Sequence, residues 1–501
     1  MKSILNRLQL LTGCLLMIFI PLLFTACSKK LEPEIYGSLS ETNFYKTAND
    51  AKAAVNAAYP GLMSAWGSGW GSAQGSFSTQ AGQTTDEAVC NWDDGGSWKA
   101  LNRLEFTPDF GSVTGHYSRL IQYISQITVS LSKIPGISMD ASLQAQYIGE
   151  LKALRAYYMQ ILYLYYGPVP ARLNADEVNN PNAPVLARPT KEEMIGYIEK
   201  DFKDAIAVLP DKFTGDNYGR FSKAACYTSL MKLYMQEKRW SDAINAGKAV
   251  QAMGYSLEPQ YGDLFNINNK NTDPREIILA IVCSPTGGDY VNIYRPHYLP
   301  SDYYDTTGGN SYQWGGYRMP WKTYHKFDPS DYRLKYVLKV YPTSATTHKD
   351  AEAAGDIGAA MIKYGPDPSD ADQQNSGVNY VVMRYADVEL LLAEALNEQN
   401  NGPTQEALNL LNDVHVTHGK LPPYSITAFN NGTFRTAIQN ERLFELWAEG
   451  VRRDDLIRWG MYIQRAKDDG FNVDEHVLLY PLPRNVVNQS NGIIKQNPGY
   501  N

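Results

Sequence analysis

Residues 384–414 read RYADVELLLAEALNEQNNGPTQEALNLLNDV, and this stretch decides the fold. Apolar residues recur every three or four positions in two runs, 384–397 and 404–414, as they do on one face of a helix. The stretch therefore predicts two helices joined by a turn. The facing residues are Val388, Leu391, Leu392 and Ala395 on the first helix and Ala407, Leu410, Leu411 and Val414 on the second.

A second helix pair is predicted upstream, at residues 222–235 and 241–253. Its pattern resembles the tetratricopeptide repeat, in which small residues let paired helices pack closely. The residues that carry this pattern are Ala225, Leu230, Tyr234, Trp240, Ala243 and Ala246. The chain is therefore expected to contain several degenerate repeats.

Three further helices are predicted nearer the amino terminus. Residues 49–59 are rich in alanine and are followed by Pro60-Gly61, which we expect to stop the helix. Residues 147–165 carry apolar side chains at helical spacing and end at Gly167-Pro168. The third helix begins with the Thr190-x-x-Glu193 capping box and ends before Pro210.

Two long segments show no helical period. Residues 67–98 are predicted to form a nearly continuous loop, and residues 255–341 a loop insertion with one short strand at 276–282. Both segments are rich in aromatic residues, which the chain as a whole uses freely, with 35 Tyr and 9 Trp. Long irregular segments in a compact protein are usually functional or disordered, and aromatic content argues against disorder.

The amino terminus predicts export. Lys2 and Arg7 precede an apolar run that ends at Phe24, too short for a membrane span of ~20 residues but typical of a signal peptide. Residues 23–27 read LFTAC and resemble the bacterial lipobox, so residues 1–26 are a signal peptide and Cys27 is lipidated. The alternative is an ordinary secretory signal with an incidental cysteine at its border.

Charge and cysteine content narrow the functional classes. The formal charge is −7, and −9 once Lys2 and Arg7 are removed, which excludes an electrostatic footprint for nucleic acid. Beyond the anchor region the thiols are Cys90, Cys226 and Cys283, an odd number that cannot form a full disulfide framework. Packing must therefore stabilise the fold.

Three segments near the carboxyl terminus resemble the SusD/RagB family of nutrient-uptake lipoproteins of Bacteroidota. The first is RYADVELLLAEA at 384–395, the second is NERLFELWAEGVRRDDLIRWG at 440–460, and the third combines YPLP at 480–483 with QNPGY at 496–500. LRAYY at 154–158 and YGPVP at 166–170 resemble the family's amino-terminal helix and its exit turn.

The resemblance implies a mainly α fold with four tetratricopeptide-type helix pairs packed against a loop-rich ligand-binding region with few short strands. It implies a division into residues 1–26, 27–240 and 241–501, the last including the aromatic insertion 255–341. It also implies a SusC-like TonB-dependent transporter as partner. The protein would sit over that transporter as a lid, anchored in the outer membrane and facing outward.

Carboxylates at Glu441, Glu445 and Glu449 fall four positions apart on one helix face and could serve glycoside hydrolysis. Like charges in that arrangement need counter-ions, so we expect a structural ion network instead. The neighbouring arginines that could supply it are Arg442, Arg452, Arg453 and Arg458.

No other catalytic motif, metal site or cofactor site is predicted. His415 and His418 are three apart but lack a third ligand, so we expect them on the surface. Asp328, Asp331 and Arg333 could form a calcium-like turn or a plain Asp-Pro turn with a local ion pair, and we assign no metal.

The aromatic loops are therefore the predicted ligand site, because Trp and Tyr rings stack on sugar faces while nearby polar groups bond to hydroxyls. The candidate residues are Trp66, Trp70, Asn91, Trp92, Asp93, Trp98, Tyr303, Tyr304, Tyr312, Trp314, Arg318 and Trp321. Each ring could instead pack on the helical body or touch the transporter. As loop groups, Trp98 and Trp314 should affect ligand retention and leave the melting temperature nearly unchanged.

The leading hypothesis is capture of an oligosaccharide and its delivery to the partner transporter, without catalysis. The second keeps the architecture but has a peptide as ligand, as in RagB-like relatives. A glycoside hydrolase is the third.

Overall fold

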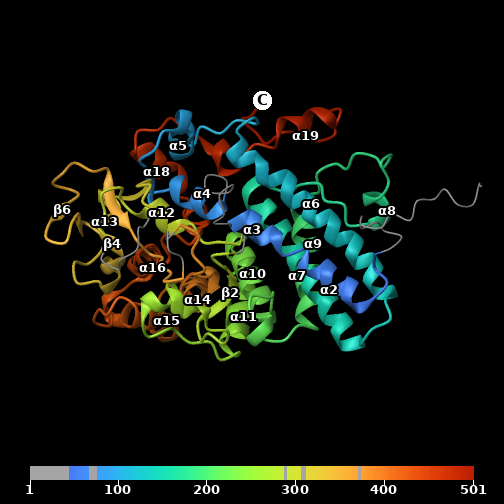
Figure 1. The fold of residues 1–501 in the computed structure, drawn as a ribbon, viewed down its shortest axis with the longest axis horizontal. Helices are drawn as coiled ribbons and strands as arrows, with labels where there is room; N and C mark the ends of the chain where they lie inside the picture. Colours follow the sequence, from blue (N-terminus) through green and yellow to red (C-terminus); the bar gives the residue numbers. More distant parts are fainter. Residues whose placement is uncertain (1–43, 67–75, 287–289, 306–311, 370–373) are drawn as a thin grey trace, which may run out of the picture. The chain divides into compact units, whose positions relative to one another are not determined.

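The computed structural model describes residues 44–66, 76–286, 290–305, 312–369 and 374–501. Thr47–Asn501 form one compact unit (Figure 1). The predicted signal peptide, Cys27 and Trp70 lie outside the described residues. None of the helices within the described ranges is long and apolar enough to cross a membrane.

The amino-terminal helices pack around one buried helix, α7. Their bounds are α2 (Ala48–Asn56), α3 (Pro60–Trp66), α6 (Gly111–Lys133), α7 (Ala141–Tyr166) and α9 (Lys191–Ile206). Helix α7 packs against both α6 and α9. At the start of α9, Thr190 and Glu193 form the predicted capping box. The prediction that Pro60 stops a helix is wrong, because α2 already ends at Asn56 and Pro60 begins α3. Proline suits a first helical turn, where its missing N–H is not needed.

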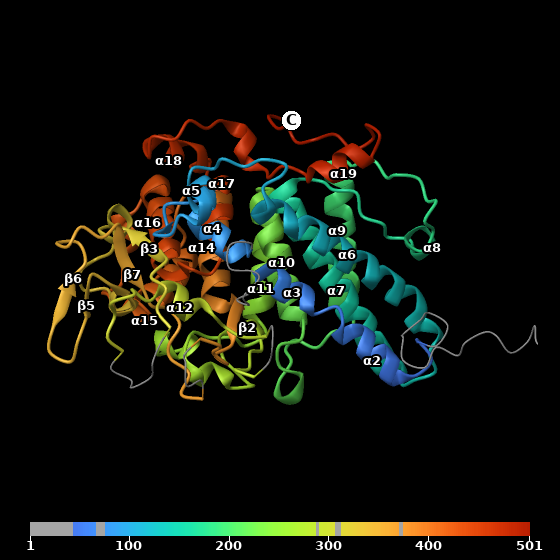
Figure 2. The ribbon, with the colours of Figure 1, turned by 45° about the horizontal axis from the view of Figure 1, so that its top comes forward.

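The two predicted helix pairs are confirmed and stack on each other. They are α10 (Lys223–Gln236) with α11 (Trp240–Gln251), and α14 (Tyr385–Asn400) with α15 (Gln405–Thr417). Helix α11 packs against α14, so the pairs follow one another as repeats do (Figure 2). The predicted division after residue 240 falls within the first turn of α11, which begins at Trp240, and stays a proposal.

The segment 255–341 contains the predicted strand and several short elements that the sequence did not indicate. Strand β2 (Ile277–Ile281) pairs antiparallel with β8 (Tyr380–Arg384), which leads directly into α14. The further elements are α12 (Tyr294–Tyr298), β3 (Tyr317–Pro320), α13 (Trp321–Tyr324) and β4 (Val337–Leu338).

A four-stranded antiparallel sheet in the order β1-β3-β7-β4 holds this segment to the rest of the unit. Its remaining strands are β1 (Val89–Cys90) and β7 (Gly358–Met361), and a separate hairpin is formed by β5 (Val340–Pro342) and β6 (His348–Asp350). In register, Val89 faces Arg318 and Cys90 faces Tyr317. This short pairing joins two segments that are more than two hundred residues apart.

The prediction of a loop at 67–98 is wrong for residues 76–98, the part that the structure describes. This part contains α4 (Phe77–Gln83), β1 and the start of α5 (Ser97–Asn102). Short elements of this kind carry too few residues for a detectable period.

The remaining helices are mostly near the carboxyl terminus. They are α16 (Asn431–Leu446), α17 (Arg452–Arg458), α18 (Tyr462–Asp468) and α19 (Arg484–Gln489), while α8 (Ala175–Val178) lies in the connection before α9. The mainly α fold with few short strands is confirmed.

Candidate functional site

The pairing of β1 with β3 brings the two predicted aromatic segments together. The backbone N–H of Asn91 donates to the carbonyl oxygen of Gly316 at 2.7 Å, which extends the strand pairing by one step. The indole Nε1 of Trp92 donates to the carbonyl oxygen of Trp314, also at 2.7 Å. The segment after β1 and the segment before β3 therefore form one site.

Five rings form a continuous aromatic cluster: Trp92, Trp98, His297, Trp314 and Tyr317. Trp92 meets Trp98 edge to face at 5.8 Å between ring centroids, and His297 stacks on Tyr317 at 5.3 Å. His297 also meets Trp314 edge to face at 4.6 Å. Edge-to-face and stacked pairs are the favoured arrangements of aromatic rings, so each ring holds the next in place.

A glycine makes this close packing possible. A Cβ atom on Gly316 would lie 2.6 Å from the ring of Trp92. Only a residue without a side chain lets the Trp92 ring lie flat against the backbone there. The orientation of Trp92 is thus determined by the backbone just before β3, against which its ring lies.

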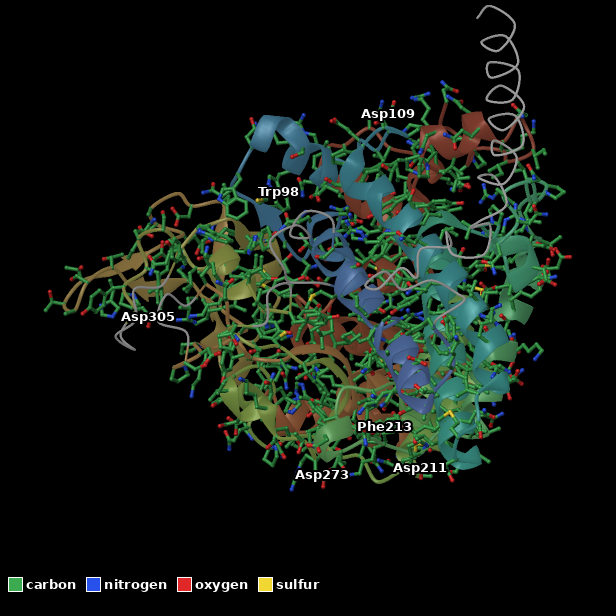
Figure 3. The ribbon with its side chains drawn as sticks, turned by 45° about the vertical axis from the view of Figure 1, so that its right-hand side comes forward. Trp98, Asp109, Asp211, Phe213, Asp273 and Asp305 are labelled. Carbon is green, nitrogen blue, oxygen red and sulfur yellow. The ribbon has the colours of Figure 1, made fainter. Side chains whose placement is uncertain are left out.

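The cluster has a buried base and an accessible edge. Trp98 is only 2% exposed and Tyr317 only 1%, whereas Trp92 and Trp314 are half-buried. The description of Trp98 as a loop stacking group is therefore wrong. Gly95 and Gly96 both have positive φ, which turns the chain into α5 and directs Trp98 inward. Trp98 is labelled in Figure 3.

Polar and aromatic side chains surround the accessible edge. Asn91 and Asp93 are exposed beside Trp92, and Asp93 pairs with Lys99 at 3.2 Å. Tyr312 is 47% exposed, two residues before Trp314. Asn91, Trp92, Asp93, Tyr312 and Trp314 are hereafter called the aromatic rim. Asp93 is thus paired with a cation at this edge.

Three other candidates lie beside the β5–β6 hairpin. Tyr303 and Trp321 pack against Tyr341, while Tyr304 is 43% exposed. The carbonyl oxygen of Tyr303 accepts a hydrogen bond from Nε2 of Gln313 at 2.6 Å, which ties Tyr303 to the segment of the rim. No such hydrogen bond ties Trp321 to the rim within the described part of the chain; its Nε1 donates to the carbonyl oxygen of Asp356 at 2.7 Å.

The side chains of Arg318 and Trp66 pack against other parts of the protein and are not part of the rim. Arg318 is 5% exposed, and its Nη1 donates to the carbonyl oxygens of Tyr298 and Tyr317 at 3.2 and 2.9 Å. Burial lowers the pKa of Arg318. Trp66 ends α3, and its ring lies so close to Gly450 that a Cβ there would come within 2.5 Å. Its described contacts are with the helical body.

His297 belongs to the cluster but was not predicted. It lies in the short helix α12, its Nδ1 is 2.7 Å from the carbonyl oxygen of Ile293, and burial lowers its pKa to about 4. The imidazole is therefore neutral at pH 7 and acts as a flat ring. A single histidine without a motif offers no signal in the sequence.

The three spaced carboxylates form the predicted ion network, but with other partners than expected. Glu441 and Glu445 accept hydrogen bonds from Nη1 of Arg333 at 2.6 and 2.8 Å, and Glu449 accepts from Nε of Arg384 at 2.7 Å. The predicted arginines pair elsewhere: Arg442 with Asp387 and Asp455, Arg452 with Asp86, Arg453 with Asp454, and Arg458 with Glu394 and Asp455. Helix α16 ends at Leu446, so Glu449 lies in the turn after it and not on the predicted helix face. All three carboxylates meet partners that sequence distance could not reveal.

The expectation that His415 and His418 lie on the surface is wrong. His415 is 5% exposed and His418 fully buried, and their Nδ1 atoms lie 2.8 and 2.7 Å from Glu441 and Glu445. Amphipathic packing of α15 directs this end of the helix into the interior. Asp331 and Arg333 form the predicted local ion pair, at 2.7 Å.

Glu276, His418 and Glu445 form the one group in the described ranges with three metal-ligating atoms within 4.8 Å of one another. All three side chains are buried, and Arg384 bridges Glu276 and Glu445. Arg384 pairs with both carboxylates and Arg333 pairs with Glu445 as well, so the group is part of the buried ion network. Its occupied carboxylates are also unsuited to bind a sugar.

The chain is similar to known proteins along most of its length. Residues 303–500 match the family model described as "SusD family", and residues 43–235 match the model "Starch-binding associating with outer membrane". The SusD-like protein P38 of Formosa agariphila is 26% identical, over 91% of this chain and 92% of the relative. The SusD-like protein P2 of the same organism is 25% identical, over 96% and 99%.

Solved structures of other proteins have the same fold. A "Laminarin binding SusD-like protein" superposes with a TM-score of 0.77 at 26% identity and covers 91% of this chain and 100% of its own. Surface glycan-binding protein A from Bacteroides thetaiotaomicron, solved with laminarihexaose, has a TM-score of 0.75 at 19% identity and covers 90% and 100%. The second likeness concerns the fold alone.

Proposed function

Since the chain belongs to the SusD family of Bacteroidota, we propose that it is a surface glycan-binding lipoprotein that captures oligosaccharide and delivers it to a transporter. The observation that carries the proposal is the aromatic rim. Trp92 and Trp314 are linked by a hydrogen bond, each is half-buried, and Tyr312 is exposed two residues before Trp314. Fixed rings with open faces are what a sugar needs for stacking.

The rim favours a neutral glycan. Its one acidic side chain, Asp93, is paired with Lys99, and Arg318 is buried under the loop. Asn91 and Asp93 can hydrogen-bond to hydroxyl groups. Laminarin, a ligand named for one relative, is therefore the first probe to try.

We expect Trp314→Ala and Tyr312→Ala each to weaken glycan binding about tenfold, the effect of losing ~1.4 kcal/mol of stacking. The measurement is calorimetric titration of the protein without residues 1–27, first with laminarihexaose and then with hits from a glycan array. Tyr197→Ala is the matched control, because Tyr197 is 40% exposed on α9, outside the rim.

Unchanged affinity in both rim variants would place the ligand elsewhere. Failure of the wild-type protein to bind any glycan would refute carbohydrate capture. Peptides that co-purify with the protein in the place of glycans, detected by mass spectrometry, would support the peptide alternative.

We propose that capture occurs without catalysis. Glu441, Glu445 and Glu449 are at most 6% exposed and are paired with cationic groups. A catalytic pair must reach the scissile bond from an open cleft. Their burial supports binding over hydrolysis, which the absence of sugar release from bound polysaccharide would test.

The anchoring at Cys27 and the transporter partner belong to the same proposal. In cells fed an alkyne-tagged fatty acid, the wild-type protein should be labelled and fractionate with the outer membrane, whereas Cys27→Ala should lose the label. A TonB-dependent barrel should co-purify with the wild-type protein. Labelling that persists in Cys27→Ala would refute the predicted site of lipidation.

A further inference from the structure

A second pocket opens at a different part of the unit, where α2, the segment 215–220 and the end of β2 meet. Its volume is about 260 Å³, and Tyr59, Tyr218 and Tyr290 line it. The pocket is separate from the aromatic rim. In Figure 3 the labelled Trp98 and Phe213, which lies just before the segment 215–220, appear at well-separated places. Tyr59, Tyr218, Tyr290, Asn56, Asp216 and Arg220 are called the tyrosine pocket below.

The polar edge of the tyrosine pocket is held in one geometry. Nη1 of Arg220 donates to Oε2 of Glu150 at 2.8 Å, and Nη2 donates to Oδ1 of Asn56 at 3.0 Å. The hydroxyl of Tyr59 donates to the same Glu150 oxygen at 2.6 Å and accepts the backbone N–H of Phe221 at 3.0 Å. The edge is therefore preorganised, and Glu150 neutralises Arg220.

Another part of the pocket wall is formed where the backbone at Gly219 lies close to the end of β2. Gly219 has φ +86°, and a Cβ atom there would lie 2.8 Å from Cγ2 of Val282 and 3.3 Å from the carbonyl oxygen of Ala280. A larger residue would push the segment 215–220 off the end of β2. Val282 is 50% exposed at the mouth, which gives the pocket an apolar lip.

We infer that the tyrosine pocket is a second glycan site that holds a single neutral sugar ring. Three aromatic walls offer faces for stacking, while Asn56, Asp216 and Arg220 offer groups for hydroxyls. A purely apolar occupant would cover these polar groups without offering them a hydrogen bond. An anionic sugar would meet the exposed Asp216 and find Arg220 already paired with Glu150.

This inference rests on the proposed function and extends it to long ligands. One polysaccharide chain that reaches both the aromatic rim and the tyrosine pocket would gain avidity without any new contact at the rim. A short oligosaccharide would occupy the two sites independently. The pocket should therefore matter more for polymers than for short fragments.

The test compares laminarihexaose in calorimetric titration with laminarin in gel-retardation electrophoresis. Tyr290→Ala is the main variant, since Tyr290 is 37% exposed, and Tyr218→Ala is the second. Arg220 is left intact because it neutralises the buried Glu150. Tyr312→Ala removes a rim contact, and Tyr197→Ala serves as the control outside both sites.

We expect the wild-type protein to bind laminarihexaose at two sites of unequal affinity. Tyr290→Ala and Tyr218→Ala should remove the weaker site, leave the stronger within about twofold, and reduce retardation by laminarin more than about threefold. Tyr312→Ala should weaken the stronger site and leave the weaker one.

Binding at one site, with pocket variants that match the wild-type protein in both assays, would overturn the second site while the proposed function stands. Loss of the stronger site in Tyr290→Ala would also overturn it, because the pocket would then be the main site. If neither laminarin nor any glycan on an array is bound, the proposed function fails first and the inference with it.

Discussion

Arg384→Met is expected to destabilise the protein by about 3–5 kcal/mol, the usual effect of removing one partner from a buried ion network. Arg384 is 1% exposed and pairs with Glu276, Glu445 and Glu449, so its loss removes one positive charge from three buried carboxylates. The free energy of unfolding from urea titration, followed by circular dichroism, measures the effect.

Arg435→Met is the matched control. Arg435 pairs with Glu398 at 2.7 Å, but its side chain is 38% exposed, and surface pairs of this kind contribute only about 0–1 kcal/mol. If both variants lose the same small amount, the ion network does not stabilise the fold.

The same network should give the wild-type protein a stability maximum between about pH 4.5 and 6.5. Burial by itself would raise the pKa of Glu445, but His418 and Arg384 outweigh it and hold that pKa well below its ordinary 4.5. A depressed carboxyl pKa contributes stability above the unfolded value, and that stability is lost as the pH falls.

His418 acts on the other side of the maximum. Burial by itself would lower its pKa, but Glu445 and Glu276 raise it above the ordinary 6.5. A raised histidine pKa contributes stability that is fully present below the unfolded value and lost as the pH rises through the folded one. Melting temperatures across pH 3–9 test both limbs, and His418→Gln should flatten the alkaline limb.

Trp98→Ala is expected to destabilise the protein by about 3–5 kcal/mol, the range for truncating a large buried aromatic side chain. The reason is that the indole is 2% exposed and supports Trp92 and Tyr317 at 5.8 and 5.4 Å. This outcome is the reverse of what the sequence suggested for a loop ring.

Tyr312→Ala is the control for Trp98→Ala, because Tyr312 is 47% exposed and its removal should change the free energy of unfolding by less than about 0.5 kcal/mol. Trp98→Phe keeps an aromatic ring in contact with Trp92 and should recover much of the loss. An unchanged melting temperature in Trp98→Ala would mean that the ring is not part of the core.

The two aromatic segments show how far sequence reasoning reached. Their composition marked both as candidates, because rings among glycines and polar residues do not fit a helical stripe, and the structure brings the two segments together. Which rings are open could not be predicted, since exposure depends on the neighbours that each ring meets after folding. Trp98 and Trp92 lie six residues apart, yet one is buried under the other's edge.

The charged helix shows a similar limit. The spacing of Glu441, Glu445 and Glu449 was enough to predict an ion network, because like charges on one face require counter-ions. The partners came from distant segments: Arg333 lies 108 and 112 residues from Glu441 and Glu445, and Arg384 lies 65 residues from Glu449. Proximity in sequence pointed to the wrong arginines, and to surface positions for His415 and His418.

The sequence by itself determined the helix pairs at 384–414 and 222–253, the capping box at Thr190 and the family, because helix periodicity, capping and motifs are written in neighbouring residues. The tertiary structure alone decided the site. Trp92 and Trp314 are 222 residues apart, and a two-residue strand pairing between β1 and β3 joins their segments. So short a pairing leaves no periodic signal, since two residues are too few to show a period.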